Sequence, residues 1–345
     1  MKSPLFVIGG LALDITATTA KTTATSILHT STPGSVRQSL GGVGRNVAEA
    51  AFRTGGNVHL ISTVGDDLSG EAVLQGMRSI GMNTEYIQTI KGQPTAVYNA
   101  LHSNDGQLVA AVADMNIFEQ MNDSKILTLL EKEKPSLICF DGNITGDSMK
   151  SITQKCSELS IPAFFEPTSV PKSLRLFDHA ETLLSQSIKF TSPNQYELEA
   201  MCHTIRSHPI LSTAKMNKTT DHMLKKAPQL AYDTLPESLF LSNFIPNIIT
   251  KLGQDGCLYV GKHSKHREAV IEYFPPEFIE AKEIKSVTGA GDCFVGTLIA
   301  NLQKHSVGLS HNTLRQVIHK AQQASIRTLK SEKAVSLDIS NDLLV

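Results

Sequence analysis

The sequence predicts an α/β fold in which a mostly parallel sheet is covered by helices on both faces. Short apolar runs of strand length alternate with longer segments whose apolar residues recur at helical spacing, over most of the 345 residues. This alternation is typical of parallel sheets, because the crossover between two parallel strands is usually an α-helix. A second observation is a pair of β-like runs joined by Asn104-Asp105-Gly106, which interrupts the alternation and predicts a hairpin.

The expected elements follow one another in chain order. Strands are expected at 5–8, 58–64, 136–141, 163–166, 188–191, 247–251 and 258–260. Helices are expected at 45–54, 69–80, 123–132, 146–159, 195–201, 291–302 and 313–330. Residues 203–246 are polar and contain four prolines, and we expect an excursion there with one or two helices. Because ligands of such folds bind beyond the carboxyl ends of the strands, polar residues that follow the strands are the first site candidates.

Two segments near the N-terminal half predict a small second sheet. Residues 15–40 are rich in Thr and Ser, and residues 94–113 contain the runs 95–101 and 108–113 on either side of the hairpin signal. We expect these strands to form a lid over a site. Apart from this sheet, residues 1–345 are expected to form a single domain.

Composition and charge exclude several classes of protein. Hydrophobic residues make up 41% of the chain and charged residues 19%, and the formal net charge is −1. This charge gives no electrostatic support for a nucleic-acid or membrane surface. No apolar stretch reaches the length of a membrane span. The apolar run at 5–13 is interpreted as a core strand rather than a signal peptide, because Gly9, Gly10 and Asp14 interrupt it.

Cysteine usage indicates a reducing environment. The five cysteines stand at 139, 156, 202, 257 and 293, mostly within apolar runs and without C-x-x-C spacing. We therefore expect reduced thiols in the core of a cytoplasmic protein, and we expect no zinc site.

The segment Ser286-Val287-Thr288-Gly289-Ala290-Gly291-Asp292 is the strongest functional signal. Small residues precede an apolar run, so the segment predicts a tight turn that leads into a helix. The first amides of a helix have no partner within it, and the helix dipole there favours an anion. Asp292 would then lie beside an anion site, where a carboxylate can take a proton from a hydroxyl that attacks a phosphate. An ordinary glycine-rich turn with Asp as helix cap is the alternative.

A second glycine-rich turn at 41–48 also opens a helix. Its three glycines bring the backbone close to a neighbour, and Asn46 in the first turn can donate and accept at once, which suits a sugar hydroxyl. Helix capping and close packing are the alternative. Asp14 follows the first strand and can accept two hydrogen bonds from a vicinal diol, unless it is a solvated loop residue.

Two further motifs follow later strands. Asn194 and Glu197 lie three apart at an expected helix start, where they can hold magnesium-bound water or a phosphate oxygen, or form a capping box. In the segment 250–256, Lys251 can meet phosphate charge and the glycines can let a nucleotide lie flat, although a plain hairpin explains the segment equally well. The chain contains neither a Walker A motif nor G-x-G-x-x-G, so a P-loop and a dinucleotide site are not supported.

Together and in this order, these motifs resemble the ribokinase-like (PfkB) carbohydrate kinases. The family's first signature is matched in full, by Gly41, Gly42, Gly44, Asn46 and Ala48, with Gly55 and Gly65 at the required spacings. The second signature is matched from Ser286 through Gly291 and Asp292 to Gly296. It departs at Thr297, where the family has Ala or Gly. The resemblance extends from Asp14 to the last helix.

The resemblance implies a Rossmann-like three-layer core with a small β lid, and ATP- and Mg²⁺-dependent phosphorylation of a sugar or nucleoside hydroxyl. By position, Asp292 is the general base, and the amides of Gly289, Ala290 and Gly291 form the anion hole. The implied sugar ligands are Asp14, Gly42 and Asn46. Asn194 and Glu197 organise phosphate and magnesium, the latter through water, and the nucleotide site is lined by Thr250, Gly253 and Gly256 beside Lys251. Such transfer depends mostly on positioning and charge stabilisation.

One departure concerns a monovalent cation. Many ribokinases have Asp where Ser286 stands, and there it helps to hold an activating ion. The corresponding positions in this chain are Ser286 and Thr288, and serine is a weaker ligand. The sequence therefore leaves potassium activation open.

Local phrases resemble one group within the family, the pseudouridine kinases. These phrases are residues 35–46, 113–118, Asp141-Gly142-Asn143 and residues 165–172. That group makes pseudouridine 5′-phosphate, the substrate of a glycosidase to which some fungal kinases are fused. The resemblance implies pseudouridine as the acceptor, with Asn143 near its ribose or base. Because 345 residues leave no room for a second catalytic domain, we expect a stand-alone kinase or an excised half.

Other interpretations remain open at this point. The nearest is another ribokinase-like enzyme of the ribokinase, adenosine kinase or ketohexose kinase type. A non-catalytic binding protein is disfavoured by the intact Asp292 and glycines, and an NAD-dependent oxidoreductase by the missing fingerprint. The expected partners are small molecules, with no nucleic acid and no membrane. The resemblance alone implies a homodimer that pairs through lid strands.

Overall fold

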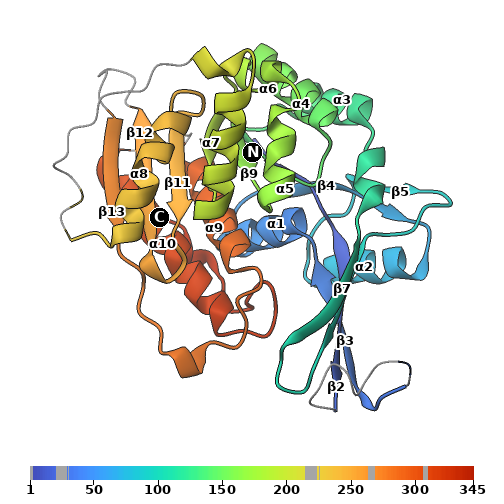
Figure 1. Cartoon of the computed structure of the whole chain (residues 1–345). Coiled ribbons are helices and arrows are strands. Elements are labelled where there is room, and N and C mark those ends of the chain that lie inside the picture. Colours follow the sequence, from blue (N-terminus) through green and yellow to red (C-terminus); the bar gives the residue numbers. More distant parts are fainter. Residues whose placement is uncertain are drawn as a thin grey trace.

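A large mixed sheet forms the body of the computed structural model, which describes residues 3–20, 29, 31–213, 224, 226–262, 269–305 and 310–345. The strand order is β13-β12-β11-β10-β9-β8-β1-β4-β5 (Figure 1). The strands from β11 to β5 are parallel, whereas β12 and β13 continue the sheet as an antiparallel pair. The bounds are β1 (Leu5–Ile8), β4 (Val58–Gly65), β5 (Ile87–Ile90), β8 (Leu137–Asp141), β9 (Ala163–Glu166), β10 (Ile188–Thr191), β11 (Asn247–Lys251), β12 (Cys257–Lys262) and β13 (Ala269–Phe274).

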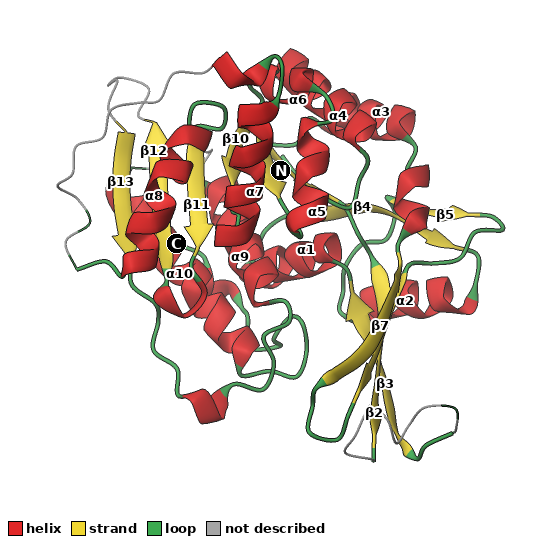
Figure 2. Ribbon diagram, viewed as in Figure 1, coloured by secondary structure: helices red, strands yellow, loops and turns green. Residues whose placement is uncertain are grey.

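Helices flank this sheet on both sides (Figure 2). They are α1 (Val43–Thr54), α2 (Leu68–Ser79), α3 (Asp123–Glu133), α4 (Gly146–Leu159), α5 (Val170–Ser173), α6 (Ala180–Leu184), α7 (Gln195–Ser207), α8 (Gln229–Leu241), α9 (Ala290–Lys304) and α10 (His311–Leu329). Across the described ranges, the helices are all too short or too polar to cross a membrane.

The core has two halves because successive side chains of a strand point to opposite faces. In β1, Phe6 and Ile8 pack with α3, α4, α7 and α8, while Leu5 and Val7 pack with α1, α2, α9 and α10. All four of these β1 residues are buried. The expected parallel sheet with a helical layer on each face is therefore confirmed.

A smaller four-stranded sheet projects from the body (Figure 1). Its order is β3-β2-β6-β7, with bounds β2 (Ala12–Thr19), β3 (Gly34–Gly41), β6 (Val97–His102) and β7 (Leu108–Asp114). The β6–β7 pair is antiparallel and turns at Gly106, whose φ is +84°, so the expected hairpin and the small sheet are confirmed. Residues 21–28 and 30 of the expected segment 15–40 lie outside the described residues.

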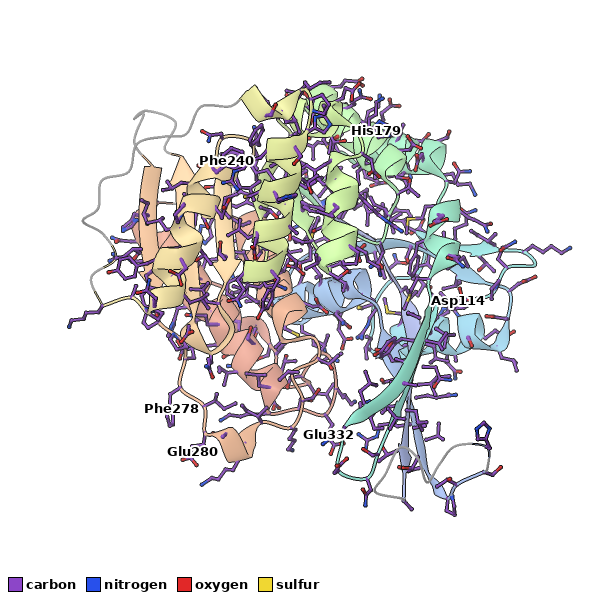
Figure 3. The ribbon with its side chains drawn as sticks, viewed as in Figure 1. Asp114, His179, Phe240, Phe278, Glu280 and Glu332 are labelled. Atoms are coloured by element: carbon purple, nitrogen blue, oxygen red, sulfur yellow. The ribbon has the colours of Figure 1, made fainter. Side chains whose placement is uncertain are left out.

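One ion pair joins the small sheet to the body. Nη1 of Arg37 in β3 lies 2.6 Å from Oε2 of Glu332, on the loop that follows α10. Both side chains are exposed, and Figure 3 labels Glu332 at the edge of the body that faces the small sheet.

Each expected strand and helix is present, with ends displaced by up to six residues, whereas β5, β13, α5, α6 and α8 were not anticipated individually. The strand β5 is only four residues long, and β13 follows residues that lie outside the described ranges. Within the described part of the expected excursion, α8 buries Leu239, Phe240 and Leu241 although it contains Pro236. Residues 214–223 and 225 of that excursion lie outside the described ranges.

The packing of α1 against α9 explains part of both signatures. A Cβ at Gly296 of α9 would lie 2.5 Å from the Val47 carbonyl oxygen and 2.6 Å from Ala50 Cβ in α1, so only glycine permits this approach. The neighbouring departure, Thr297, is matched within this interface. Its hydroxyl lies 3.1 Å from that of Thr54, and both residues are fully buried. Because the Thr54 hydroxyl donates to the Ala50 carbonyl at 2.8 Å, it can accept from Thr297 and give that buried hydroxyl a partner.

We expect Gly296→Ala to lower the free energy of unfolding by about 2 kcal/mol. The added methyl group clashes with α1, and the cost of this overpacking exceeds the gain from the higher helix propensity of alanine. Urea unfolding followed by circular dichroism measures the change. A loss below about 0.5 kcal/mol would contradict the close packing of the two helices.

Candidate active site

The predicted site residues converge at the carboxyl edge of the large sheet. At this edge, the carboxyl ends of four strands lie beside the first turns of three helices. The strands are β1, β8, β9 and β11, and the helices are α1, α7 and α9. Direct contacts link these elements: Asn46 with Asp292, Gly10 with Asp141, and Lys251 with Glu166. The side chains that the sequence singled out one motif at a time therefore belong to one region.

The turn before α9 has the expected tight geometry. Gly289 has a φ of +79°, and a Cβ there would lie 1.9 Å from the carbonyl oxygen of Ala334. Only glycine fits this position, both for its backbone angle and for its space. The hydroxyl of Ser325 donates to the Ala290 carbonyl at 2.8 Å and fixes the first turn from α10. The Ala290 nitrogen donates to the Val287 carbonyl at 3.4 Å, and the helix N-terminus that begins here is of the kind that can bind an anion.

Asp292 stands in the first turn of α9 and faces α1. Its Oδ2 accepts a hydrogen bond from Asn46 Nδ2 at 2.7 Å. Burial raises the pKa of Asp292, and the Asn46 hydrogen bond and the charges of Lys251 and Arg45 oppose that rise. The other atom of the Asn46 amide, Oδ1, is buried and has no partner among the described residues. A hydroxyl donor placed there would satisfy it.

The turn before α1 is built by close contact with the first strand. Gly42 has a φ of +91°, and a Cβ there would lie 2.4 Å from the Gly10 carbonyl oxygen. The backbone nitrogen of Arg45 donates to that same oxygen at 2.9 Å. The buried guanidinium of Arg45 pairs with Glu49 and donates to the Leu40 carbonyl. The close packing considered for this motif is therefore present, and it directs Asn46 toward Asp292.

Asp14 lies in β2, where the small sheet meets the body. Its carboxylate occupies the space over Gly41, since a Cβ at Gly41 would lie 2.1 Å from Asp14 Oδ1. Burial raises the pKa of Asp14 to about 6, the Arg45 charge opposes this, and the Asp292 charge adds to it. Asp14 in the small sheet thus lies close enough to Asp292 in α9 for their charges to interact.

A polar cluster lies at the end of β8. Asp141 Oδ2 accepts from the Gly10 backbone nitrogen and from Asn143 Nδ2, both at 2.9 Å. Lys172 Nζ donates to Asn143 Oδ1 at 2.5 Å, and Arg175 donates to the Asn143 carbonyl at 2.9 Å. Lys172 and Arg175 were not among the predicted site residues, because an isolated basic residue after a strand carries no motif.

Asn194 and Glu197 form the capping box that was the alternative explanation for their spacing. Asn194 Oδ1 accepts from the backbone nitrogens of Tyr196 and Glu197, and Glu197 Oε2 accepts from the Asn194 nitrogen at 2.8 Å. The box places the buried Glu197 near Lys251, whose charge it influences. These are oxygen ligands of the kind that Mg²⁺ takes together with water and phosphate.

Lys251 ends β11 and forms an ion pair with Glu166 at the end of β9, with 3.0 Å between Nζ and Oε1. A Cβ at Gly291 would lie 3.5 Å from this ammonium, so Lys251 reaches the turn before α9. The preceding residue, Thr250, is fully buried and shares a hydrogen bond of 2.8 Å with Ser238. Its hydroxyl therefore points into the core.

A cavity of about 660 Å³ adjoins this lysine. Among the residues that line it are Lys251, Gly253, Gly256, Ala290 and Gly291. The remainder of its wall is largely apolar and includes Phe278, which is 84% exposed and labelled in Figure 3. Its size and mixed lining suit a nucleotide whose phosphates point to the turn.

The candidate positions for a monovalent cation lie just before the turn. Ser286 Oγ accepts from the Thr288 backbone nitrogen at 3.2 Å, and the Thr288 side chain is exposed. The described residues contain no group of three or more His, Cys, Asp or Glu side chains that could hold a metal ion. A magnesium ion bound mainly by water and phosphate does not require such a group.

The tight glycine turn, the buried Asp292 that follows it and the adjoining cavity agree with an α/β phosphotransferase that has an alcohol group as acceptor. The chain belongs to the pfkB family of carbohydrate kinases, whose model matches residues 3–338.

Curated relatives and solved structures agree with this family. The chain is 28% identical to a pseudouridine-metabolizing bifunctional protein of Schizosaccharomyces pombe, over 96% of this chain and 46% of that protein. It is 26% identical to a pseudouridine kinase of Arabidopsis thaliana, over 86% of this chain and 84% of that protein. The chain thus spans about half the length of the S. pombe protein. An Arabidopsis thaliana ribokinase complexed with ribose and ATP has the same fold, with a TM-score of 0.71, 15% identity and coverage of 99% and 97%.

Proposed function

We propose that this chain transfers the terminal phosphoryl group of ATP to the 5′-hydroxyl of pseudouridine and produces pseudouridine 5′-phosphate and ADP. The observation that carries the proposal is the similarity to the Arabidopsis pseudouridine kinase over 86% of this chain and 84% of that protein. The name of the S. pombe relative supports the same substrate. The cluster of Asn143 and Lys172 supplies donors and an acceptor that suit the edge of a uracil.

In this proposal Asp292 removes the proton from the attacking hydroxyl. Its hydrogen bond with Asn46 holds the carboxylate in place, and the unpartnered Asn46 Oδ1 accepts from a neighbouring hydroxyl of the acceptor. The amides of Gly289, Ala290 and Gly291 surround the phosphoryl group, and the Lys251 ammonium balances its charge. Mg²⁺-ATP supplies the phosphoryl group and a metal that neutralises charge as it transfers.

Binding is divided among the remaining predicted residues. Asp14 and the Gly42 turn bind the ribose, and Gly253 and Gly256 line the nucleotide cavity. Asn194 and Glu197 hold the water shell of Mg²⁺. Thr250 contributes by fixing the end of β11, because its hydroxyl is bonded to Ser238. Potassium activation through Ser286 and Thr288 stays a prediction.

We further propose a cytoplasmic homodimer that pairs through the small sheets. Val36 in β3 and Val112 in β7 are each 69% exposed, and such apolar outer strands suit a partner strand surface. All five cysteines are free and buried, which agrees with a reducing compartment.

The alternative acceptor is ribose or another nucleoside. The fold shared with the Arabidopsis ribokinase supports it. An ADP-release assay with pseudouridine, uridine, adenosine and ribose separates the two cases. We expect kcat/KM for pseudouridine to exceed that for uridine by at least about 10²-fold, since a site built for a hydrogen-bonding edge rejects an analogue that leaves its groups unpaired. Preference for ribose or adenosine would replace the proposed substrate and retain the kinase.

We expect Asp292→Asn to lower kcat by about 10³-fold or more, because an amide cannot accept the proton that the carboxylate takes. The affinity for ATP should stay within a few-fold of wild type, measured by calorimetry. Near-normal turnover, or loss of ATP binding with equal loss of turnover, would count against Asp292 as the base.

We expect acceptor binding to weaken as the pH falls through about 6, the pKa of Asp14. Its folded pKa is raised, so the carboxylate that accepts hydrogen bonds from the ribose is ionised above that pH and protonated below it. The acceptor Kd should rise about tenfold per pH unit below the pKa. In Asp14→Asn the limb centred on this pKa should disappear, and ATP affinity should be unchanged. A limb that persists in the variant would assign it to another group.

A further inference from the structure

The ion pair between Lys251 and Glu166 crosses the end of an intervening strand. Because β10 lies between β9 and β11, the two backbones are two strand spacings apart, about 10 Å. The charged atoms are nevertheless only 3.0 Å apart, since two long side chains lean toward each other over the end of β10. A shorter acid at position 166 would leave a gap.

Backbone hydrogen bonds fix the main chain of both residues. Their side chains can therefore move mainly by rotation about the side-chain torsions. The Lys251 nitrogen donates to the Pro193 carbonyl at 2.8 Å, and the Glu166 carbonyl accepts from Gly142 at 3.0 Å. A lysine loses much side-chain entropy when it is fixed in one geometry. The ion pair with Glu166 fixes this lysine before any ligand arrives.

The ammonium that Glu166 fixes lies at the turn before α9. Lys251 Nζ would be 3.5 Å from a Cβ at Gly291, and both residues line the 660 Å³ cavity. The groups whose charges bear on the pair come from two other elements: Glu197 from α7 and Asp292 from α9. Both are acidic, so the Lys251 ammonium stands among carboxylates.

Burying the Glu166 carboxylate at this position costs free energy. It is 3% exposed, and its Oε2 has no partner within the described part of the chain. Burial raises the pKa of Glu166, and the adjacent Lys251 charge opposes the rise by favouring the ionised carboxylate. A buried ion pair of this kind is weak evidence for stability, because well-packed apolar residues do as well or better. The location of the Lys251–Glu166 pair beside the turn 289–291 indicates a role in the reaction rather than in stability.

We propose that Glu166 is a positioning residue, which holds the Lys251 ammonium at the turn 289–291 where the transferring phosphoryl group is received. The inference rests on the proposed kinase function. Glu166 acts only through Lys251 and does not itself contact the substrates. Preorganised charge lowers a barrier because no reorganisation is needed during the reaction.

The test is a double-mutant cycle with Glu166→Gln, Lys251→Met and the double variant. Glutamine keeps the size of the side chain and removes its charge. We expect Glu166→Gln to lower kcat about tenfold to a hundredfold, with the acceptor KM unchanged and Tm close to wild type. In the Lys251→Met background the same substitution should have no further effect on kcat.

The pH profile supplies a readout that a merely structural role would not move. Burial lowers the pKa of Lys251, and the carboxylates of Glu166 and Glu197 outweigh this and raise it. The lysine loses its charge as the pH rises through its pKa. We therefore expect the alkaline limb of kcat to move to lower pH in Glu166→Gln.

Glu237→Gln is a matched control, because it removes a carboxylate that pairs with Arg206 away from the site. It should leave kcat and both limbs of the pH profile unchanged. Additive effects of Glu166→Gln and Lys251→Met, or an unmoved alkaline limb, would overturn the positioning role. Failure of the wild-type protein to bind ATP in calorimetry would instead overturn the kinase proposal.

Discussion

The hydrogen bond between Asn46 and Asp292 is the contact on which the arrangement of the site depends. It joins the first turns of α1 and α9, which are almost 250 positions apart in the chain. The bond requires the packing of these helices to bring Asn46 Nδ2 to 2.7 Å from Asp292 Oδ2. That approach is possible because Gly296 lets α9 pack directly on α1, and because Gly42 lets the α1 turn rest on the first strand. The glycines of both signatures therefore act through distance. At Gly296 and Gly42, a side chain would push apart the elements that bring Asp292 to Asn46.

Most of the fold could be predicted because its strands are buried on both faces. The run 163–165 is continuously apolar and is flanked by helical spacing, so its place in a parallel sheet follows from the pattern alone. The edge strand β5 has the sequence Ile-Gln-Thr-Ile and is only partly buried, so it lacks such a run. The helix α8 was expected only as part of a polar excursion, because Pro236 and a weak amphipathic pattern conceal a buried apolar segment. The structure of such elements depends on tertiary packing, which the sequence of a single segment does not contain.

The candidate site divides in the same way. Asp292, Asn46 and the glycines were predictable because each belongs to a turn with its own spacing. Lys172 was not predicted as a site residue, and Glu166 was placed at the end of a strand without a role, since the importance of each comes from neighbours elsewhere in the chain. Asn194 and Glu197 make the cap that their spacing also suggested, so the sequence could not separate a structural from a metal-related role. Thr250 shows the limit of carrying a role over by position, because its hydroxyl turns into the core.

The ion pair between Arg37 and Glu332 has a mechanical consequence. Glu332 lies two residues from Ala334, whose carbonyl oxygen presses against Gly289. The loop after α10 therefore contacts the small sheet through Glu332 and contacts the turn 289–291 through Ala334. An exposed pair of this kind contributes at most about 1 kcal/mol and is screened by salt, so it acts as a weak clasp. The contact between Arg37 and this loop therefore costs little to break, and high salt weakens it further.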